Sequence, residues 1–163
     1  MKTSLYKIFL SSIFLISALG FYSCSDENPS VPESDITIDQ LPSVAQSFLK
    51  SYFPDVEAKN IVEMKEDEMV LYQVYLENGF EIVFNSEGYW QQVVAGNDMT
   101  VPNGIIPEQI LQTLTNQYHG YGVVSINTEG QNYHVVLSNN QGGSSIDLVL
   151  NQSGEIISGG DMD

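Results

Sequence analysis

Two ten-residue stretches of this chain read almost alike and lie 66 positions apart: EIVFNSEGYW at residues 81–90 and DLVLNQSGEI at residues 147–156. Each has an acidic residue, three apolar residues, an Asn and, three positions after the Asn, a Gly. Asn at the first and Gly at the fourth position is typical of a type I turn, in which Asn caps its own turn and Gly adopts a positive φ. Such a turn closes a hairpin between two antiparallel strands. The repeated stretch therefore predicts the third strand and last hairpin of two similarly folded units.

Apolar residues at helical spacing precede the strands of each unit. In the first unit they are Leu41, Val44, Ala45, Phe48, Leu49 and Tyr52, and in the second Ile106, Ile110, Leu111, Leu114 and Tyr118. This spacing places them on one side of a helix. We expect Pro42 and Pro107 in the first turn of these helices, where a missing N–H costs nothing. Pro54 ends the first helix, and Gly120 and Gly122 end the second.

Short alternating stretches that are typical of strands follow each helix. We predict strands near 57–64, 69–77, 80–85 and 89–95, and again near 122–128, 132–138, 145–151 and 155–158. Leu49 aligns with Leu114 and Val74 with Val135, and this spacing is longer than that of a solenoid repeat. The predicted fold class is α+β, with two tandem repeats, each one helix packed on a four-stranded antiparallel meander sheet. The repeats span 41–95 and 106–159, with a linker at 96–105 and a tail at 160–163.

Residues 1–23 have the pattern of a secretory signal peptide. Lys2 and Lys7 precede fifteen uncharged residues, IFLSSIFLISALGFY, a run shorter than the about 20 residues of a membrane-spanning helix. The run ends at FYSC, which resembles a bacterial lipobox, although Phe21 stands where Leu, Val or Ile is usual. That resemblance implies that Cys24 carries a lipid anchor. An ordinary signal peptide with an incidental cysteine is the alternative interpretation. Cys24 is the only cysteine, so a disulfide within one chain is impossible.

Residues 24–40 are polar, acidic and contain proline, which predicts a flexible tether between lipid and fold. Ser25, rather than Asp, follows Cys24, which favours the outer membrane, and Ser25-Asp26-Glu27 resembles the acidic export tag of some surface lipoproteins. We therefore predict an outer-membrane lipoprotein that is periplasmic or surface-exposed and contacts the membrane through its lipid anchor only.

The charge of the chain limits its partners. Removal of the predicted signal peptide leaves 24–163, which contains three lysines, no arginine and all 21 acidic side chains, a formal charge of −18. Nucleic-acid binding depends on Lys and Arg contacts to phosphate, so nucleic acid is excluded as a partner. A basic protein, a cationic peptide or a divalent cation remains compatible with this charge, and solubility alone also accounts for it.

No stretch has the pattern of a catalytic, metal or cofactor site. His119 and His134 are the only histidines, without further ligands at metal-binding spacing. KEDE at residues 65–68 lacks the alternating acids and central Gly of a calcium loop. NQGGSS at residues 140–145 is no nucleophile elbow, which needs Gly on both sides of Ser, and is interpreted as a hairpin loop. We expect no catalytic residue, no metal and no cofactor.

A helix followed by a four-stranded meander, repeated in an exported lipoprotein, resembles the PepSY-like family, which shares its architecture with the β-lactamase inhibitory protein. The resemblance spans about residues 41–158 and rests on LPSVAQSFLKSYFP with VYLENGFEIVFNSEGYW, and IPEQILQTLTNQYHGYG with DLVLNQSGEI. It implies a non-enzymatic module that binds an exported protein or peptide. The alternative is an inhibitor or modulator of an exported hydrolase or protease.

The strand pattern indicates a candidate contact face. If Tyr72, Val74, Leu76, Ile82 and Phe84 face the helices, then Leu71, Tyr75, Val83 and Tyr89 face away, and Trp90 points inward. In a two-layer fold the outward face is normally polar, so exposed apolar and aromatic side chains there indicate a partner contact. Two alternatives stay open: the two units pack their sheets together, or the linker at 96–105 covers these residues.

Overall fold

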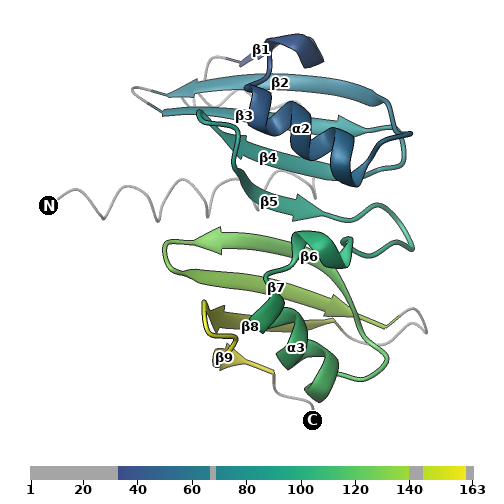
Figure 1. The fold of residues 1–163 in the computed structure, drawn as a ribbon, viewed down its shortest axis with the longest axis vertical. Helices are drawn as coiled ribbons and strands as arrows, with labels where there is room; N and C mark the ends of the chain where they lie inside the picture. The colour runs from purple at the N-terminus through teal and green to yellow at the C-terminus, as the bar shows by residue number, and fades with distance from the viewer. Residues whose placement is uncertain (1–32, 67–68, 140–144, 161–163) are drawn as a thin grey trace, which may run out of the picture. The chain divides into compact units, whose positions relative to one another are not determined.

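The computed structural model describes residues 33–66, 69–139 and 145–160 (Figure 1). In chain order the elements are β1 (Glu33–Asp35), the 3₁₀ turn η2 (Ile38–Gln40), α2 (Ser43–Tyr52), β2 (Ala58–Glu66), β3 (Met69–Leu76), β4 (Glu81–Asn85), β5 (Trp90–Val94), the 3₁₀ turn η3 (Asn103–Ile105), α3 (Glu108–Gln117), β6 (Gly122–Glu129), β7 (Asn132–Ser138), β8 (Ile146–Asn151) and β9 (Ile156–Gly159). The predicted signal peptide and Cys24 lie outside the described residues. We use "first half" for α2 with β2–β5 and "second half" for α3 with β6–β9.

Both helices begin directly after a proline. Pro42 and Pro107 are the N-cap residues, with ψ of 142° and 138°, so the expectation that they lie in the first helical turn is wrong by one position. Proline has no N–H to donate, but its carbonyl oxygen accepts from Gln46 N at 3.1 Å and, in α3, from Leu111 N at 2.9 Å. An extended ψ at the cap and a carbonyl directed into the helix are the usual geometry of a helix start.

The described strands form one antiparallel sheet of nine strands in chain order, β1 to β9. The two separate four-stranded sheets of the prediction are therefore corrected: β5 pairs with β6 over three residue pairs, from Gln92–Asn127 to Val94–Ser125. The halves thus join edge to edge and do not pack face to face. Each half does contain a helix followed by a four-strand meander, with strand limits close to the predicted ones.

An additional strand extends the sheet at its N-terminal edge. Glu33–Asp35 pairs antiparallel with Met64–Val62 of β2, and Ile36 N donates to Ile61 O at 3.0 Å. The prediction of a flexible tether over 24–40 is therefore wrong for residues 33–40, and residues 24–32 lie outside the described residues. The sequence pattern did not predict β1, because ESDITI, residues 33–38, has apolar residues only at its C-terminal end. Residues 33–35 therefore show no alternation of apolar and polar side chains.

The two repeated stretches form the same turn. Asn85 Oδ1 accepts from Glu87 N at 3.0 Å and from Tyr89 N at 2.9 Å, and Asn151 Oδ1 accepts from the N–H groups of residues 153 and 155, both at 3.0 Å. The fourth residues, Gly88 and Gly154, have φ of +88° and +81°. The predicted turn chemistry is confirmed in both places. Each hairpin also carries a bulge next to its turn, in β5 and in β9.

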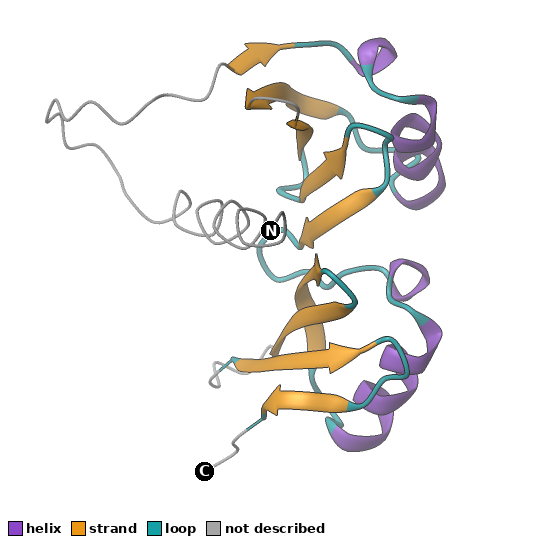
Figure 2. Cartoon of the chain, turned by 90° about the vertical axis from the view of Figure 1, so that its left-hand side faces the viewer, coloured by secondary structure: helices purple, strands orange, loops and turns teal. Residues whose placement is uncertain are grey.

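Both helices cover the same face of the sheet (Figure 2). The core lies between them and that face, and it includes Ala45 of α2, Ile110 of α3, and Ile82, Phe84 and Leu148 of the sheet, all 0% exposed. Burial of each large apolar side chain contributes about 1.5–3 kcal/mol. The predicted inward-facing residues are confirmed: Val74, Leu76, Ile82 and Phe84 are buried in this core, with Tyr72 and Trp90 packed against it.

Candidate functional site

The candidate site is the sheet face opposite the helices, which we call the open face. On β3 and β4 it carries the residues that alternate with the core residues. The register pairs Leu71 with Asn85, Gln73 with Val83, and Tyr75 with Glu81. Tyr89 belongs to the same face, because Asn85 N donates to Tyr89 O at 2.9 Å across the hairpin. The structure therefore places all four predicted contact residues on the open face of the first half.

The exposure of these four residues differs from the prediction. Tyr89 is 57% exposed and Tyr75 is partly buried, but Leu71 and Val83 are only 8% and 4% exposed. Leu71 and Val83 therefore lie on the predicted face but are not exposed there. Strand periodicity predicts which face a side chain takes, whereas burial on that face depends on the surroundings, which a single strand does not encode.

Tyr75 has an environment that keeps its phenol neutral. Burial raises the pKa of Tyr75 above its ordinary value, and the negative charges of Glu81 and Glu33 raise this pKa further. At neutral pH the side chain is therefore an apolar ring with a hydroxyl that donates or accepts a hydrogen bond. That combination is frequent in protein contact surfaces and offers no base for proton transfer.

The open face of the second half carries a polar group that periodicity did not indicate. The register pairs Asn127 with His134, and His134 with Val149. His134 Nδ1 lies 3.2 Å from Asn127 Oδ1, and His134 Nε2 contacts Asp147 Oδ1. His134 therefore bridges three strands, β6, β7 and β8. The alternation of Ser125 and Asn127 along β6 could have indicated a polar face in the sequence. Their neighbour His134 could not have been predicted, because its position depends on the register between β6 and β7.

The described contacts of His134 differ from those of a hydrolytic triad. A hydrolytic triad needs a serine hydroxyl on one imidazole nitrogen and a carboxylate on the other. Here Asn127 and Asp147 face the two nitrogens. Ser125 Oγ, on the same face of β6, is buried and has no hydrogen-bond partner within the described part of the chain. These contacts of His134 join the neighbouring strands β6, β7 and β8.

Three further observations concern metals, charges and membrane spans. Within residues 33–66, 69–139 and 145–160, no three His, Cys, Asp or Glu side chains gather as a metal site. Of the acidic stretch at 65–68, Lys65 pairs with Glu63 at 2.7 Å, and residues 67–68 lie outside the described ranges. A search of the described helices finds none with the length and apolar character needed to cross a bilayer.

Comparison with known proteins gives the family. Residues 70–158, more than half of the chain, match the family described as "Putative beta-lactamase-inhibitor-like, PepSY-like". The chain belongs to this PepSY-like family, as the sequence pattern predicts. No curated protein matches the chain.

Solved structures of similar fold come from Bacteroides. A "putative calcium-regulated periplasmic protein" from Bacteroides thetaiotaomicron is 26% identical with a TM-score of 0.71, over 79% of this chain and 97% of that one. A "putative periplasmic protein" of the DUF2874 family from Bacteroides vulgatus is 24% identical with a TM-score of 0.72, over the same shares. A second Bacteroides vulgatus protein, described as of unknown function, is 24% identical with a TM-score of 0.71 over 80% of this chain and all of that chain.

Proposed function

We propose that the chain is a non-enzymatic binding module of the cell envelope, which contacts an exported protein or peptide through the open face of its sheet. The observation that carries the proposal is the continuous nine-stranded sheet with both helices on one side. Tyr75 and the 57% exposed Tyr89 supply aromatic contact groups on the other side. Aromatic residues are enriched among the residues that dominate binding energy at interfaces.

The experiment is capture of the partner from native envelopes with matched variants. Tyr89→Ala removes an exposed ring from the open face, whereas Val44→Ala truncates a 40% exposed side chain on α2. We expect Tyr89→Ala to reduce capture by about tenfold, equivalent to about 1.4 kcal/mol, and Val44→Ala to leave it unchanged. Equal capture by both variants would place the contact elsewhere.

The non-enzymatic part of the proposal has its own test. We expect the purified protein to turn over no peptide, ester or glycoside substrate. Turnover that is abolished by His134→Gln or Asp147→Asn, with folding intact, would overturn the proposal. The pair is informative because His134 and Asp147 are in contact on the open face.

The alternative is an inhibitor of an exported hydrolase or protease. The support is the description of the family as beta-lactamase-inhibitor-like. This alternative predicts stoichiometric loss of activity when the protein is titrated against the enzyme that it captures. A captured partner that is no hydrolase, or a hydrolase that stays fully active when saturated, contradicts the alternative and leaves the binding module in place.

The N-terminal residues and one similar structure support a proposed location. We propose an outer-membrane lipoprotein anchored through Cys24, and the description of the similar Bacteroides thetaiotaomicron protein as periplasmic supports export. Several acyl chains anchor a protein stably, whereas one chain does so only marginally. Cys24→Ala should release the folded protein from the membrane fraction. Sedimentation of this variant with outer membranes after a high-salt wash would contradict the lipid anchor.

We also propose that the two halves are tandem repeats of one unit. The support is that the Asn side chain accepts from the same two backbone N–H positions in the turns after β4 and β8, and that a bulge follows each turn. If the turns are equivalent, replacing residues 85–88 by the sequence of residues 151–154 should change the free energy of unfolding by less than about 0.5 kcal/mol. A loss of several kcal/mol in urea unfolding would show that the turns are not interchangeable.

A further inference from the structure

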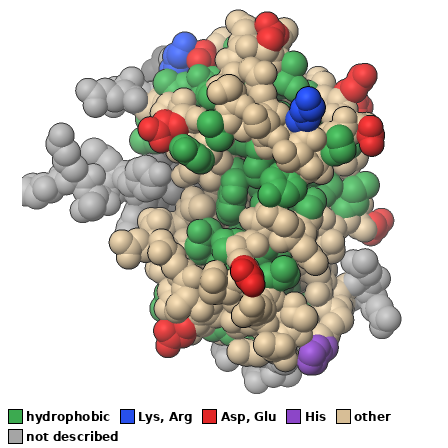
Figure 3. Space-filling view, viewed as in Figure 1, with side chains coloured by type: hydrophobic (Ala, Val, Ile, Leu, Met, Phe, Trp, Pro, Cys, Tyr) green, Lys and Arg blue, Asp and Glu red, His purple; other side chains and the backbone are tan. Residues whose placement is uncertain are grey.

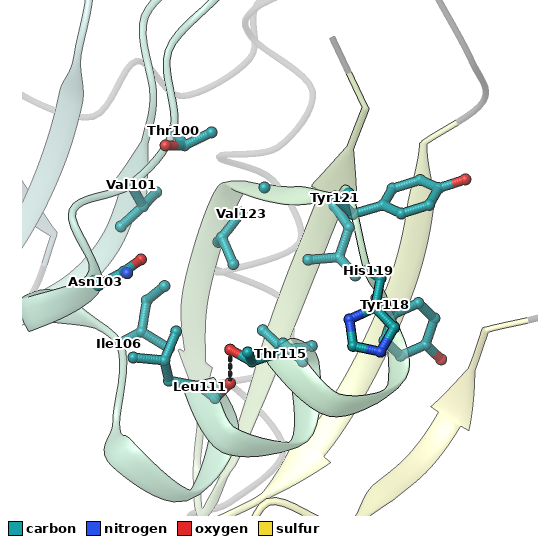
Figure 4. Close-up of a pocket in the computed structure, with 14 residues that line it drawn as sticks. Thr100, Val101, Asn103, Ile106, Leu111, Thr115, Tyr118, His119, Tyr121 and Val123 are labelled. Carbon is teal, nitrogen blue, oxygen red and sulfur yellow. Dashed lines mark hydrogen bonds between the residues drawn. The ribbon is translucent and has the colours of Figure 1, made fainter. Parts of the chain in front are cut away.

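A cleft opens beside the C-terminal end of α3, on the helix-covered side of the second half (Figure 4). It has a volume of about 240 Å³ and adjoins a second hollow of about 370 Å³. The two share the lining residues Thr100, His119, Gly120, Tyr121 and Gly122. The second hollow alone is within the size range of small-molecule sites in proteins. Because both helices cover the face opposite the open face, this cleft is separate from the proposed protein-binding surface.

The floor of the cleft is apolar and its rim is polar. Val101, Leu114, Val123 and Leu137 line it and are at most 6% exposed. Around this floor the described lining residues include the side chains of Thr100, Asn103, Thr115, His119, Tyr121, Ser138 and Asn139. An apolar floor with a few hydroxyl and amide groups at the rim is the usual composition of a ligand site.

The lining of the cleft differs from the rest of this acidic chain in its charge. The protein has 21 acidic residues, and Figure 3 shows acidic side chains scattered over the helix-covered face. None of the described residues that line either hollow is Asp, Glu, Lys or Arg. Apart from the imidazole of His119, the described lining offers a charged ligand no ion-pair partner, so such a ligand would lose hydration on entering without that compensation. The lining therefore selects for a ligand without net charge.

The corresponding position of the first half carries a different residue and makes different contacts. When Leu41 is aligned with Ile106, Gln46 of α2 corresponds to Leu111 of α3. Gln46 Nε2 donates to Leu41 O at 2.8 Å and to Asp39 O at 3.4 Å, which ties α2 to the segment before it. Leu111 has no side-chain donor, so no such bond ties α3 to its preceding segment. Leu111 instead contributes an apolar wall of the cleft.

Two glycines, Gly120 and Gly122, line the cleft without contributing a side chain. A Cβ on Gly122 would lie 2.3 Å from Thr100 Cγ2, so a larger residue would displace Thr100 from the rim. Gly120, in the turn after α3, has φ of +83°, which side-chain-bearing residues rarely adopt, and lines the opening. The absence of side chains at both positions leaves the hollow accessible between Thr100 and His119.

We propose that this cleft binds a small uncharged molecule with one apolar, ring-sized face and at least one hydroxyl or amide group. The apolar face lies on the floor formed by Val101, Leu114 and Val123, and the polar group bonds to the hydroxyls and amides of the rim. The proposal rests on the cleft alone and is independent of the proposed function.

The test is a titration of the full-length protein followed by amide chemical shifts. The probes are benzyl alcohol, benzoate and benzylammonium, which share one ring and differ in charge. We expect saturable shifts with benzyl alcohol in residues 100–106 and 111–123. Both charged probes should bind at least about tenfold more weakly, because their charge is desolvated without a partner.

Variants on one helix locate the binding. Thr115→Phe places a ring at the rim, whereas Asn116→Phe places the same ring on the neighbouring exposed position, which does not line the cleft. We expect Thr115→Phe to weaken benzyl alcohol binding at least about tenfold and Asn116→Phe to leave it unchanged. If Thr115→Phe fails to fold, Leu111→Gln, which inserts the first-half residue, takes its place with the same expectation. Absence of saturable shifts, equal binding of benzoate, or equal binding by the rim variant and Asn116→Phe would overturn the proposal.

Discussion

On the open face the first half carries Val62, Gln73 and Val83 side by side on β2, β3 and β4, whereas the second half carries Asn127, His134 and Val149 at the corresponding places. On the helix-covered face the corresponding residues of the two halves are alike. Ile82 and Leu148 are both apolar and 0% exposed, and so are Val74 and Val135. The residues that build the core are thus similar in both halves, while the open face differs. Two halves with the same order of elements therefore need not carry the same surface chemistry.

The largest expected effect comes from the shared core. Phe84→Ala and Leu150→Ala remove side chains at matching register positions that are both 0% exposed. Loss of these side chains should cost about 3–5 kcal/mol for Phe84→Ala and about 2–5 kcal/mol for Leu150→Ala. Urea unfolding followed by circular dichroism and by Trp90 fluorescence should give one transition for both variants, because β5 joins β6. Two transitions, with each variant shifting only one, would show that the halves fold independently.

The turn glycines give the next largest effect. Gly88→Ala and Gly154→Ala each introduce a Cβ at positive φ, and the new atom would lie 2.8 Å from Ala45 N or 2.4 Å from Gln109 O. We expect each to lose about 2–3 kcal/mol of unfolding free energy, from strain and from displacement of the helix.

Gly130→Ala is the matched control for this pair. Gly130 has φ of +63°, and a Cβ there would meet nothing within 4 Å. Its loss should be about 1–2 kcal/mol, from backbone conformation alone. Thermal unfolding of the three variants would contradict the packing explanation if all three lost the same amount.

A smaller effect is expected from the Asn caps of the two turns. Asn85→Ala and Asn151→Ala each remove an acceptor that receives two backbone N–H groups. These turns are exposed, so water replaces part of the lost bonding, and each variant should lose about 1 kcal/mol. The two losses should agree within about 0.5 kcal/mol in urea unfolding if the turns are equivalent. A loss confined to one variant would separate the turns energetically.

The smallest expected effect depends on pH and concerns Tyr75, on the open face of the first half. Burial and the charges of Glu81 and Glu33 raise the pKa of Tyr75. The folded state therefore favours the neutral phenol, and this contribution is present below the unfolded pKa of about 10 and is lost as pH rises through the folded pKa. Urea unfolding at about pH 8 and at about pH 10.5, on either side of that unfolded value, should show a smaller loss for Tyr75→Phe than for the natural protein. An identical loss in both proteins would contradict the assignment to Tyr75.

Much of the fold was predictable because it depends on local patterns. The turn residues Asn85 and Asn151, the glycines that follow them and the alternation around Ile82 and Leu148 each carry their own structural meaning. The joining of β5 to β6 and the addition of β1 were not predictable, because pairing between strands depends on partners far along the chain. The proline caps were missed by one position because boundaries are set by hydrogen bonding that the sequence pattern does not resolve.

The candidate site was predictable only in part. Alternation assigned Leu71, Tyr75, Val83 and Tyr89 to the correct face, but it did not give the burial of Leu71 and Val83. The contact of His134 with Asn127 and Asp147 joins three strands, so no single stretch of sequence contains it. The cleft beside α3 similarly combines residues from 100–106, α3 and β6. Features made by one strand or turn are readable from sequence, whereas features made by several elements need their arrangement.

The central claim is that the partner meets the open face and not the helices. It is tested most directly by placing a photo-cross-linking residue at Tyr75 on the open face, and at the 40% exposed Val44 on α2, in the full-length protein in its native cells. We expect a discrete higher-mass adduct from position 75, which is lost on adding Tyr89→Ala, and no such adduct from position 44. An adduct from position 44 but none from position 75 would show that the partner meets the helices instead.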